Sequence, residues 1–419
     1  MTLHQPSEAE LLRAGSLKWT GRMPSSGIPP LGAWVAEMDY GTAPAVQERL
    51  IRAVREGFLG YPTPWANEAV VEALVDFQDH QFGWVLKPGW VRTSQSVLAA
   101  LNYTIANLTR PDSAVVVPTP AYMPFLTIPL AHEREVIAVT SRHTPSTVDQ
   151  IRADEANVGP DVDPGVNSVK RAQQGWSLNL DGIEDALKKG AGLVMLCDPW
   201  NPTGRVLTVP ELRALGDVVS KYDALVFADE IHSPLVLDDP GSFVSYASLG
   251  PKHAAHTVTA FAASKGWNLG GLMAGQVILP DADLRRRWDD AGGGPSASGL
   301  GSIAAATAYT ETPGWLPEVT RQISANLDLL EDALAGIPVD YHRPQATYLA
   351  WLGFDEYVFE PGQSPASVLL EDYGIAVNDG ATLGPEFENW ARVNVAMSDH
   401  LWKDAVQRIG EFARNQPRK

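Results

Sequence analysis

The sequence of 419 residues is poor in cysteine, in basic residues relative to acidic ones, and in long apolar runs. Cys197 is the single cysteine, which excludes an internal disulfide and a cysteine-based zinc site. The 32 Lys and Arg residues face 50 Asp and Glu residues, and the net charge of −18 argues against binding to nucleic acid or an anionic membrane. No apolar run approaches the roughly 18–20 residues that a transmembrane helix needs.

The N-terminal sequence MTLHQPSEAELLRAG has no basic patch followed by an apolar stretch, which a secretory signal would have. We therefore expect a cytoplasmic protein that contacts neither membrane nor nucleic acid. The length and the 45% content of hydrophobic residues are sufficient for two globular domains.

Short apolar runs rich in Val, Ile and Phe alternate with helical patterns along the first two-thirds of the chain. These runs cover residues 114–120, 192–199, 224–230, 257–264 and 274–280. Strands that are apolar on both faces and separated by helices predict an α/β fold, with a mainly parallel sheet sandwiched by helices.

The character of the sequence changes after the glycine cluster at 292–294, where long helical patterns and a few strand-like pieces follow. We predict a large α/β domain over residues 46–291 and a smaller α+β domain built from residues 1–45 and 292–419. The polar segment 143–175, rich in Asp, Gly, Pro and Asn, is predicted to be an irregular surface excursion.

Polar residues follow several of the predicted strands, and ligands gather at the carboxyl ends of strands in a parallel sheet. Asn201 lies in the turn DPWNPTG, and Asp229 and His232 lie in DEIH. Ser264 and Lys265 end the run TVTAFAASK. A serine-rich turn, SQSV at 94–97, opens a helical pattern.

Each of these features also has an ordinary structural explanation. Ser-Gln-Ser before a helix is most often an N-cap, His232 alone would more often be a hydrogen-bonded structural histidine, and a lone lysine is usually a surface residue. The pair His253 and His256 has helical spacing but no third ligand nearby in sequence. We interpret that pair as surface residues and predict no metal site.

Taken together, the set matches the needs of a pyridoxal 5′-phosphate (PLP) enzyme. Such an enzyme uses a lysine that holds the aldehyde as a Schiff base and a carboxylate that keeps the pyridine nitrogen protonated. It also uses amide and imidazole groups for the ring oxygen, and a helix N-terminus for the phosphate. The covalent bond to PLP explains why an apolar strand ends in an amine, because a buried free ammonium would be costly to desolvate.

The runs LCDPWNPTGRVLT, ADEIHSPLVL and AASKGWNLGGL resemble the signatures of fold-type I PLP enzymes, the aspartate aminotransferase superfamily. The resemblance extends from SLKWTG at residue 16 to WARVNVA at residue 390. Within the superfamily, WVAEMDYGTAP and the histidine of DEIH are most similar to the C–S β-lyases of the MalY/PatB type, which cleave cystathionine.

This resemblance implies a role for each matching residue. Lys265 would be the Schiff-base lysine and the acid–base at the substrate Cα, Asp229 the partner of the pyridine nitrogen, and Tyr122 the aromatic residue stacked on the ring. The remaining implied contacts are Asn201 and His232 to the ring oxygen, Gln95, Ser96, Val97 and Ser264 to the phosphate, Tyr61 to the phosphate of a neighbouring subunit, and Arg392 to the substrate α-carboxylate. The role of Tyr61 implies a homodimer with shared active sites.

Three positions depart from the superfamily pattern. The phosphate loop reads SQSV where relatives often carry glycine or proline, Ala262 stands where many members have serine, and Met273 replaces a phosphate-binding arginine. Residues that could line the substrate pocket, or serve only as packing, are Trp34, Tyr348, Trp351 and the turn 378–383.

The resemblance favours α,β-elimination of a sulfur-containing amino acid such as cystathionine, giving a thiol, pyruvate and ammonia. The alternative is transamination between an amino acid and a 2-oxoacid, which would use the same lysine and aspartate. A third possibility, a regulatory binding role added to the lyase activity, stays open.

Overall fold

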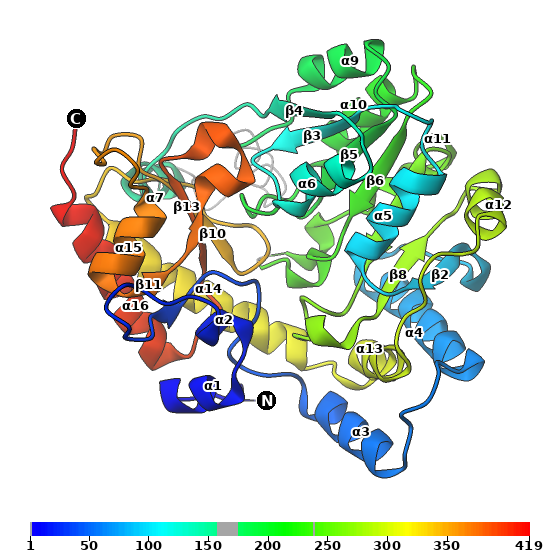
Figure 1. Ribbon diagram of the computed structural model, residues 1–419, viewed down its shortest axis with the longest axis horizontal. Coiled ribbons are helices and arrows are strands. Elements are labelled where there is room, and N and C mark those ends of the chain that lie inside the picture. The colour runs from blue at the N-terminus through cyan, green and yellow to red at the C-terminus, as the bar shows by residue number, and fades with distance from the viewer. Residues whose placement is uncertain (1, 157–174, 238) are drawn as a thin grey trace.

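The computed structural model describes residues 2–156, 175–237 and 239–419 (Figure 1). Seven strands of the described chain form one sheet, in which neighbouring strands are parallel except where β8 pairs antiparallel with β2 and β7. In sheet order the strands are β2 (Val91–Ser94), β8 (Gly275–Ile278), β7 (Thr257–Phe261), β6 (Leu225–Asp229), β5 (Leu193–Cys197), β3 (Val115–Thr119) and β4 (Val136–Thr140).

Helices cover both faces of this sheet, which explains why its central strands are apolar throughout. Side chains of α5, α6 and α12 pack on one face, and side chains of α9 and α10 pack on the other. The helices of this part are α3 (Pro44–Arg55), α4 (Pro64–Phe82), α5 (Val97–Asn107), α6 (Pro124–Ala131), α9 (Leu180–Lys188), α10 (Val209–Val219), α11 (Pro251–Ala254), α12 (Ala282–Asp290) and α13 (Gly299–Glu311).

A second unit combines the N-terminal and C-terminal segments, which lie side by side on the left of Figure 1. Parallel pairing of β1 (Leu31–Gly32) with β11 (Ile375–Ala376) joins the two segments. An antiparallel sheet adds β12 (Asn378–Asp379), β13 (Trp390–Asn394), β10 (Leu349–Gly353) and β9 (Asp340–Tyr341). The accompanying helices are α1 (Glu8–Ala14), α2 (Leu17–Thr20), α7 (Val148–Ala156), α14 (Trp315–Leu334), α15 (Pro365–Tyr373) and α16 (Asp399–Asn415). The predicted α/β fold class is thus confirmed.

The packing differs from the predicted junction at residue 292. Helix α13 packs against α3 and α4, so this part of the predicted small domain lies with the large one. The glycines at 292–294 all have positive φ, and the chain turns at this point after α12. The long helix α14 instead leads into the second unit, where it packs against α16.

The predicted irregular excursion 143–175 contains a helix, α7, within its described part. Val148 at the start of α7 is 2% exposed and belongs to the same apolar cluster as residues of α14 and α16. The polar composition concealed this helix because it buries few apolar side chains. Residues 157–174 of the excursion lie outside the described residues. Over the described chain, no helix is both long and apolar enough to cross a membrane.

Candidate active site

The carboxyl ends of β5, β6 and β7 open into a cavity of about 440 Å³. Ten of the residues predicted from sequence line it: Gln95, Ser96, Val97, Tyr122, Asn201, Asp229, His232, Ser264, Lys265 and Arg392. The eleventh, Tyr61, does not; it is 94% exposed on the turn between α3 and α4. The parallel strands β5, β6 and β7 bring Asn201, Asp229 and Lys265 together at one edge of the sheet.

Lys265 is held at the turn after β7 by a main-chain acceptor. Its Nζ donates to the carbonyl oxygen of Ala36 at 3.0 Å. Burial, together with the positive charge of Arg392, lowers the pKa of Lys265 to about 8, although Asp229 and Glu37 act in the opposite direction. A large part of the lysine is therefore a neutral, nucleophilic amine at slightly alkaline pH.

Asp229 is the last residue of β6 and is 4% exposed. Its Oδ1 accepts the backbone N–H of Ile231 at 3.1 Å, and the carboxyl has no salt bridge among the described residues. Burial raises its pKa to about 7, against the opposing effects of the Ile231 N–H and Lys265. A buried carboxyl with so few partners matches the need for a protonated ring nitrogen beside it, which would supply the missing donor and positive charge.

Arg392, in the middle of β13, presents its guanidinium to the same cavity. Its Nη1 donates to Asn201 Oδ1 at 3.0 Å, and its Nη2 donates to Asn378 Oδ1 at 2.7 Å. Its buried Nε has no hydrogen-bond partner among the described residues. Burial lowers the pKa of Arg392 to about 10, so the group remains charged at neutral pH. An unpaired donor on a buried, charged fork is suited to a carboxylate ligand.

Asn201 acquires a defined orientation from this contact. Because its Oδ1 accepts from Arg392, its Nδ2 is left to donate, as a ring oxygen of PLP would require. His232 also lines the cavity and is 2% exposed, and within the described part of the chain its buried Nδ1 has no hydrogen-bond partner. Burial and the charges of Lys265 and Arg392 hold the pKa of His232 well below its usual value, so the ring is neutral.

The serine-rich turn is both a helix cap and one wall of the cavity. Ser96 Oγ accepts the N–H of Ala99 at 3.0 Å, which makes Ser96 the N-cap of α5. The N–H of Gln95 donates to Pro295 O, so this group is already used. The N–H groups of Val97 and Leu98 have no acceptor among the described residues, and they remain for an anion at the positive end of the helix dipole.

Of the further residues named from sequence, two line the cavity and two do not. Trp34 and Asn378 line it. Tyr348 lies behind it and donates its hydroxyl hydrogen to Ala36 O at 2.8 Å. Trp351 is buried in another cluster, stacked on Trp390 at 5.2 Å.

No local sequence pattern indicated the role of the Ala36 backbone carbonyl, which accepts from both Lys265 and Tyr348. Ala36 lies within the WVAEMDY run, and the resemblance of this run to a family signature gives no position in the fold. The interpretation of His253 and His256 as surface residues was wrong, because they are 6% and 9% exposed. His256 Nε2 lies 2.9 Å from the Tyr246 hydroxyl, and the ring of His253 lies against Gly216 of α10.

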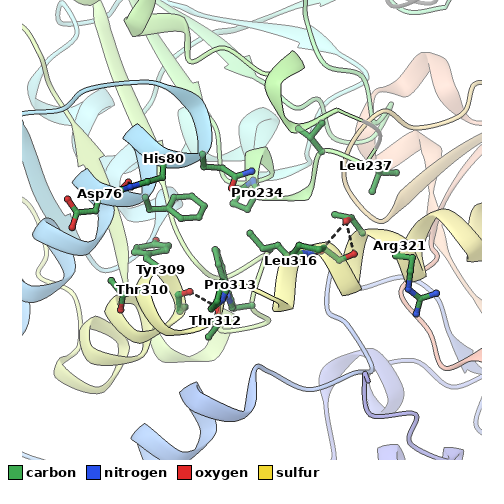
Figure 2. A pocket seen from close by; sticks show the side chains of 17 residues that line it. Asp76, His80, Pro234, Leu237, Tyr309, Thr310, Thr312, Pro313, Leu316 and Arg321 are labelled. Atoms are coloured by element: carbon green, nitrogen blue, oxygen red, sulfur yellow. Dashed lines mark hydrogen bonds between the residues drawn. The ribbon is translucent and has the colours of Figure 1, made fainter. Parts of the chain in front are cut away.

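A larger cavity, of about 670 Å³, lies elsewhere in the molecule (Figure 2). Asp76 and His80 of α4 lie across from Tyr309 and Thr310 of α13, and Leu316 and Arg321 of α14 extend the wall. None of the predicted site residues is among its described lining residues. A choice between the two cavities by volume would therefore have selected the one with no lysine among its described lining residues.

The fold and the donor set define a fold-type I PLP enzyme. The lysine, the unpaired buried carboxyl, the amide donor and the helix N-terminus each match one part of PLP. The sequence model of the aminotransferase class I and II family matches residues 164–409, and the chain belongs to this family, whose cofactor is PLP.

Particular relatives are similar over nearly their whole length. Cystathionine β-lyase of Corynebacterium glutamicum is 32% identical over 96% of this chain and 98% of its own. Cystathionine β-lyase PatB of Bacillus subtilis is 28% identical over 96% of this chain and 97% of its own. A crystal structure of a Corynebacterium diphtheriae protein matches with a TM-score of 0.83 and 28% identity, covering 99% of both chains.

Proposed function

We propose that this protein is a PLP-dependent C–S β-lyase that cleaves L-cystathionine or a related cysteine S-conjugate. Cystathionine and water would give homocysteine, pyruvate and ammonia. The observation that carries the proposal is that Lys265, Asp229 and Arg392 face one cavity with complementary charge states. The names of the Corynebacterium and Bacillus relatives favour elimination over transamination.

Each residue has a defined task in this reaction. The Arg392 fork binds the substrate α-carboxylate and so places the Cα–H bond near Lys265. The neutral amine of Lys265 removes the Cα proton. When bound, PLP would supply an electron sink for the pair left on Cα, which would allow the thiolate to leave from Cβ. Asp229 keeps the ring nitrogen protonated, and Asn201 and His232 orient the ring through its oxygen.

Purified holoprotein incubated with cystathionine alone tests the proposal. Continuing release of pyruvate and homocysteine, lost in Lys265→Ala, is the expected result. Turnover that requires an added 2-oxoacid would instead establish the runner-up, an aminotransferase. We expect the Lys265→Ala variant to have the same fold as the wild type, and comparison of their circular dichroism spectra is the control.

We also propose a cytoplasmic homodimer with shared active sites. Tyr61 is exposed in the single chain, and its apolar neighbours Leu59 and Trp65 have exposed fractions of 65% and 48%. Ile51 and Val54 of α3 are exposed as well. A second copy covering this apolar stretch would bring Tyr61 to the phosphate of the neighbouring site.

Mixing Tyr61→Ala with Lys265→Ala tests the shared site, because half of the dimers would then be hybrids with one intact site. Equal mixing should therefore restore about a quarter of wild-type activity. Two inactive variants that fail to complement would contradict a shared site.

A further inference from the structure

Three metal-ligating side chains converge where the described part of the 143–175 excursion meets β9. One donor atom each of His143, Asp340 and His342 lies within 4.8 Å of the other two. His143 Nε2 is 2.7 Å from Asp340 Oδ2. None of the three lines the PLP cavity. The cluster therefore has no role in the proposed reaction.

Each of the three side chains is oriented by a second contact. The ring of His143 stacks on Trp176, with centroids 4.0 Å apart and planes 14° apart. Asp340 Oδ1 accepts the N–H of Ser146 at 3.2 Å, which directs the other carboxylate oxygen toward His143. Such outer contacts are what fixes metal ligands in place.

His342 is held in one tautomer. Its Nε2 lies 2.8 Å from the carbonyl oxygen of Thr144, and a carbonyl can only accept, so Nε2 carries the proton. Its Nδ1 then has a free lone pair, as a neutral histidine ligand requires.

The three groups match the preferences of one class of ion. Two imidazole nitrogens and one carboxylate oxygen suit a divalent first-row transition cation such as Zn²⁺ better than Ca²⁺ or Mg²⁺, which prefer oxygen. Three protein ligands leave a coordination position for water. The side chains are part-buried, with 16% of His143 and 14% of Asp340 exposed, so a cation can reach them from solvent.

We propose that His143, Asp340 and His342 form a binding site for a divalent transition cation. The ion would take the place of the proton between His143 Nε2 and Asp340. That proton would move to His143 Nδ1, for which the described residues provide no hydrogen-bond partner. The ligands come from the segment after β4 and from β9. These two segments already share the bond from Tyr341 N–H to Ser146 O at 2.9 Å. A bound cation would thus tie the central sheet to the second unit.

Isothermal titration of untagged, PLP-loaded protein with Zn²⁺ tests the proposal. We expect saturable binding of one ion per chain, weakened at least about tenfold in His143→Gln and in His342→Gln. His400→Gln, which removes an exposed histidine on α16, is the matched control and should bind as the wild type does. Because the cation binds only the folded chain, Tm should rise with Zn²⁺ concentration in the wild type and the control alone.

Cobalt(II) provides a second readout, since ligand-field absorption bands report nitrogen and oxygen ligands directly. These bands should appear in the wild type and be lost in Asp340→Asn, a variant that keeps side-chain volume. Absence of saturable binding, or binding that is unchanged in all three ligand variants, would overturn the proposal. His143 and Asp340 would then form only an ion pair that holds the segment after β4 against β9. PLP absorbance and circular dichroism verify that each variant is folded.

Discussion

The amine of Lys265 and the carbonyl oxygen of Ala36 lie 3.0 Å apart, although 229 residues separate them in the chain. The hydroxyl of Tyr348 donates to the same oxygen at 2.8 Å. The WVAEMDY segment thus contributes a main-chain acceptor to the site, and this acceptor holds the amine where the strand end delivers it. The contact links the N-terminal segment, the central sheet and the C-terminal unit.

The first prediction concerns the pH dependence of PLP uptake by the apoprotein. Only the neutral amine attacks an aldehyde, and burial lowers the pKa of Lys265 to about 8. The protonated, unreactive form dominates below that pH, so the uptake rate should rise through about pH 8 and level off above it. Stopped-flow absorbance measures this rate. A rise centred near the ordinary lysine pKa would show that burial does not tune the amine.

The second prediction concerns Asp229→Asn. The amide has the same size but cannot supply the negative charge that keeps the ring nitrogen protonated, so kcat should fall by about 10²–10³. Borohydride reduction followed by peptide mapping should still find the pyridoxyl label at position 265. Loss of the label would mean that Asp229 is needed for binding, and unchanged kcat would remove its assigned role.

The third prediction separates the two roles of Ser96. Asn at this position can still accept the Ala99 N–H as an N-cap, and Asp can do the same while adding a negative charge. We expect Ser96→Asn to retain PLP with modest loss and Ser96→Asp to lose most of its affinity, because the carboxylate repels the phosphate. Equilibrium dialysis of PLP measures both variants. Equal affinities would place the phosphate away from the α5 N-terminus.

The fourth prediction concerns the buried pair Lys18 and Asp39. Lys18 Nζ lies 2.9 Å from Asp39 Oδ1, both side chains are 1% exposed, and Trp19 Nε1 donates to the same oxygen. Lys18→Ala should reduce the free energy of unfolding by about 3–5 kcal/mol, because it leaves a buried carboxylate without its cation. Urea unfolding followed by circular dichroism measures the loss.

The double variant Lys18→Met/Asp39→Leu is the control for that pair. It removes both charges and should recover much of the lost stability. A double variant no more stable than Lys18→Ala would indicate that packing around Trp19, not the unpaired charge, accounts for the effect.

The sequence predicted those parts of the site that depend on local pattern. Apolar runs ending in Asp229 and Lys265 indicated strands of a covered parallel sheet, and such strands deliver their last side chains to one edge. The Ser96 cap followed from the short-range chemistry of helix starts. These features depend on a few residues that are close together in sequence, so they can be predicted without the tertiary structure.

Only the tertiary structure decided which distant groups meet. Ala36, Asn378 and the orientation of Arg392 depend on how the N-terminal segment and β13 pack beside the sheet, and no local pattern encodes that contact. The burial of His253 and the convergence of His143 with Asp340 arise in the same way, through packing between elements far apart in sequence. Periodicity reports the face a residue occupies, whereas only the folded chain determines what that face touches.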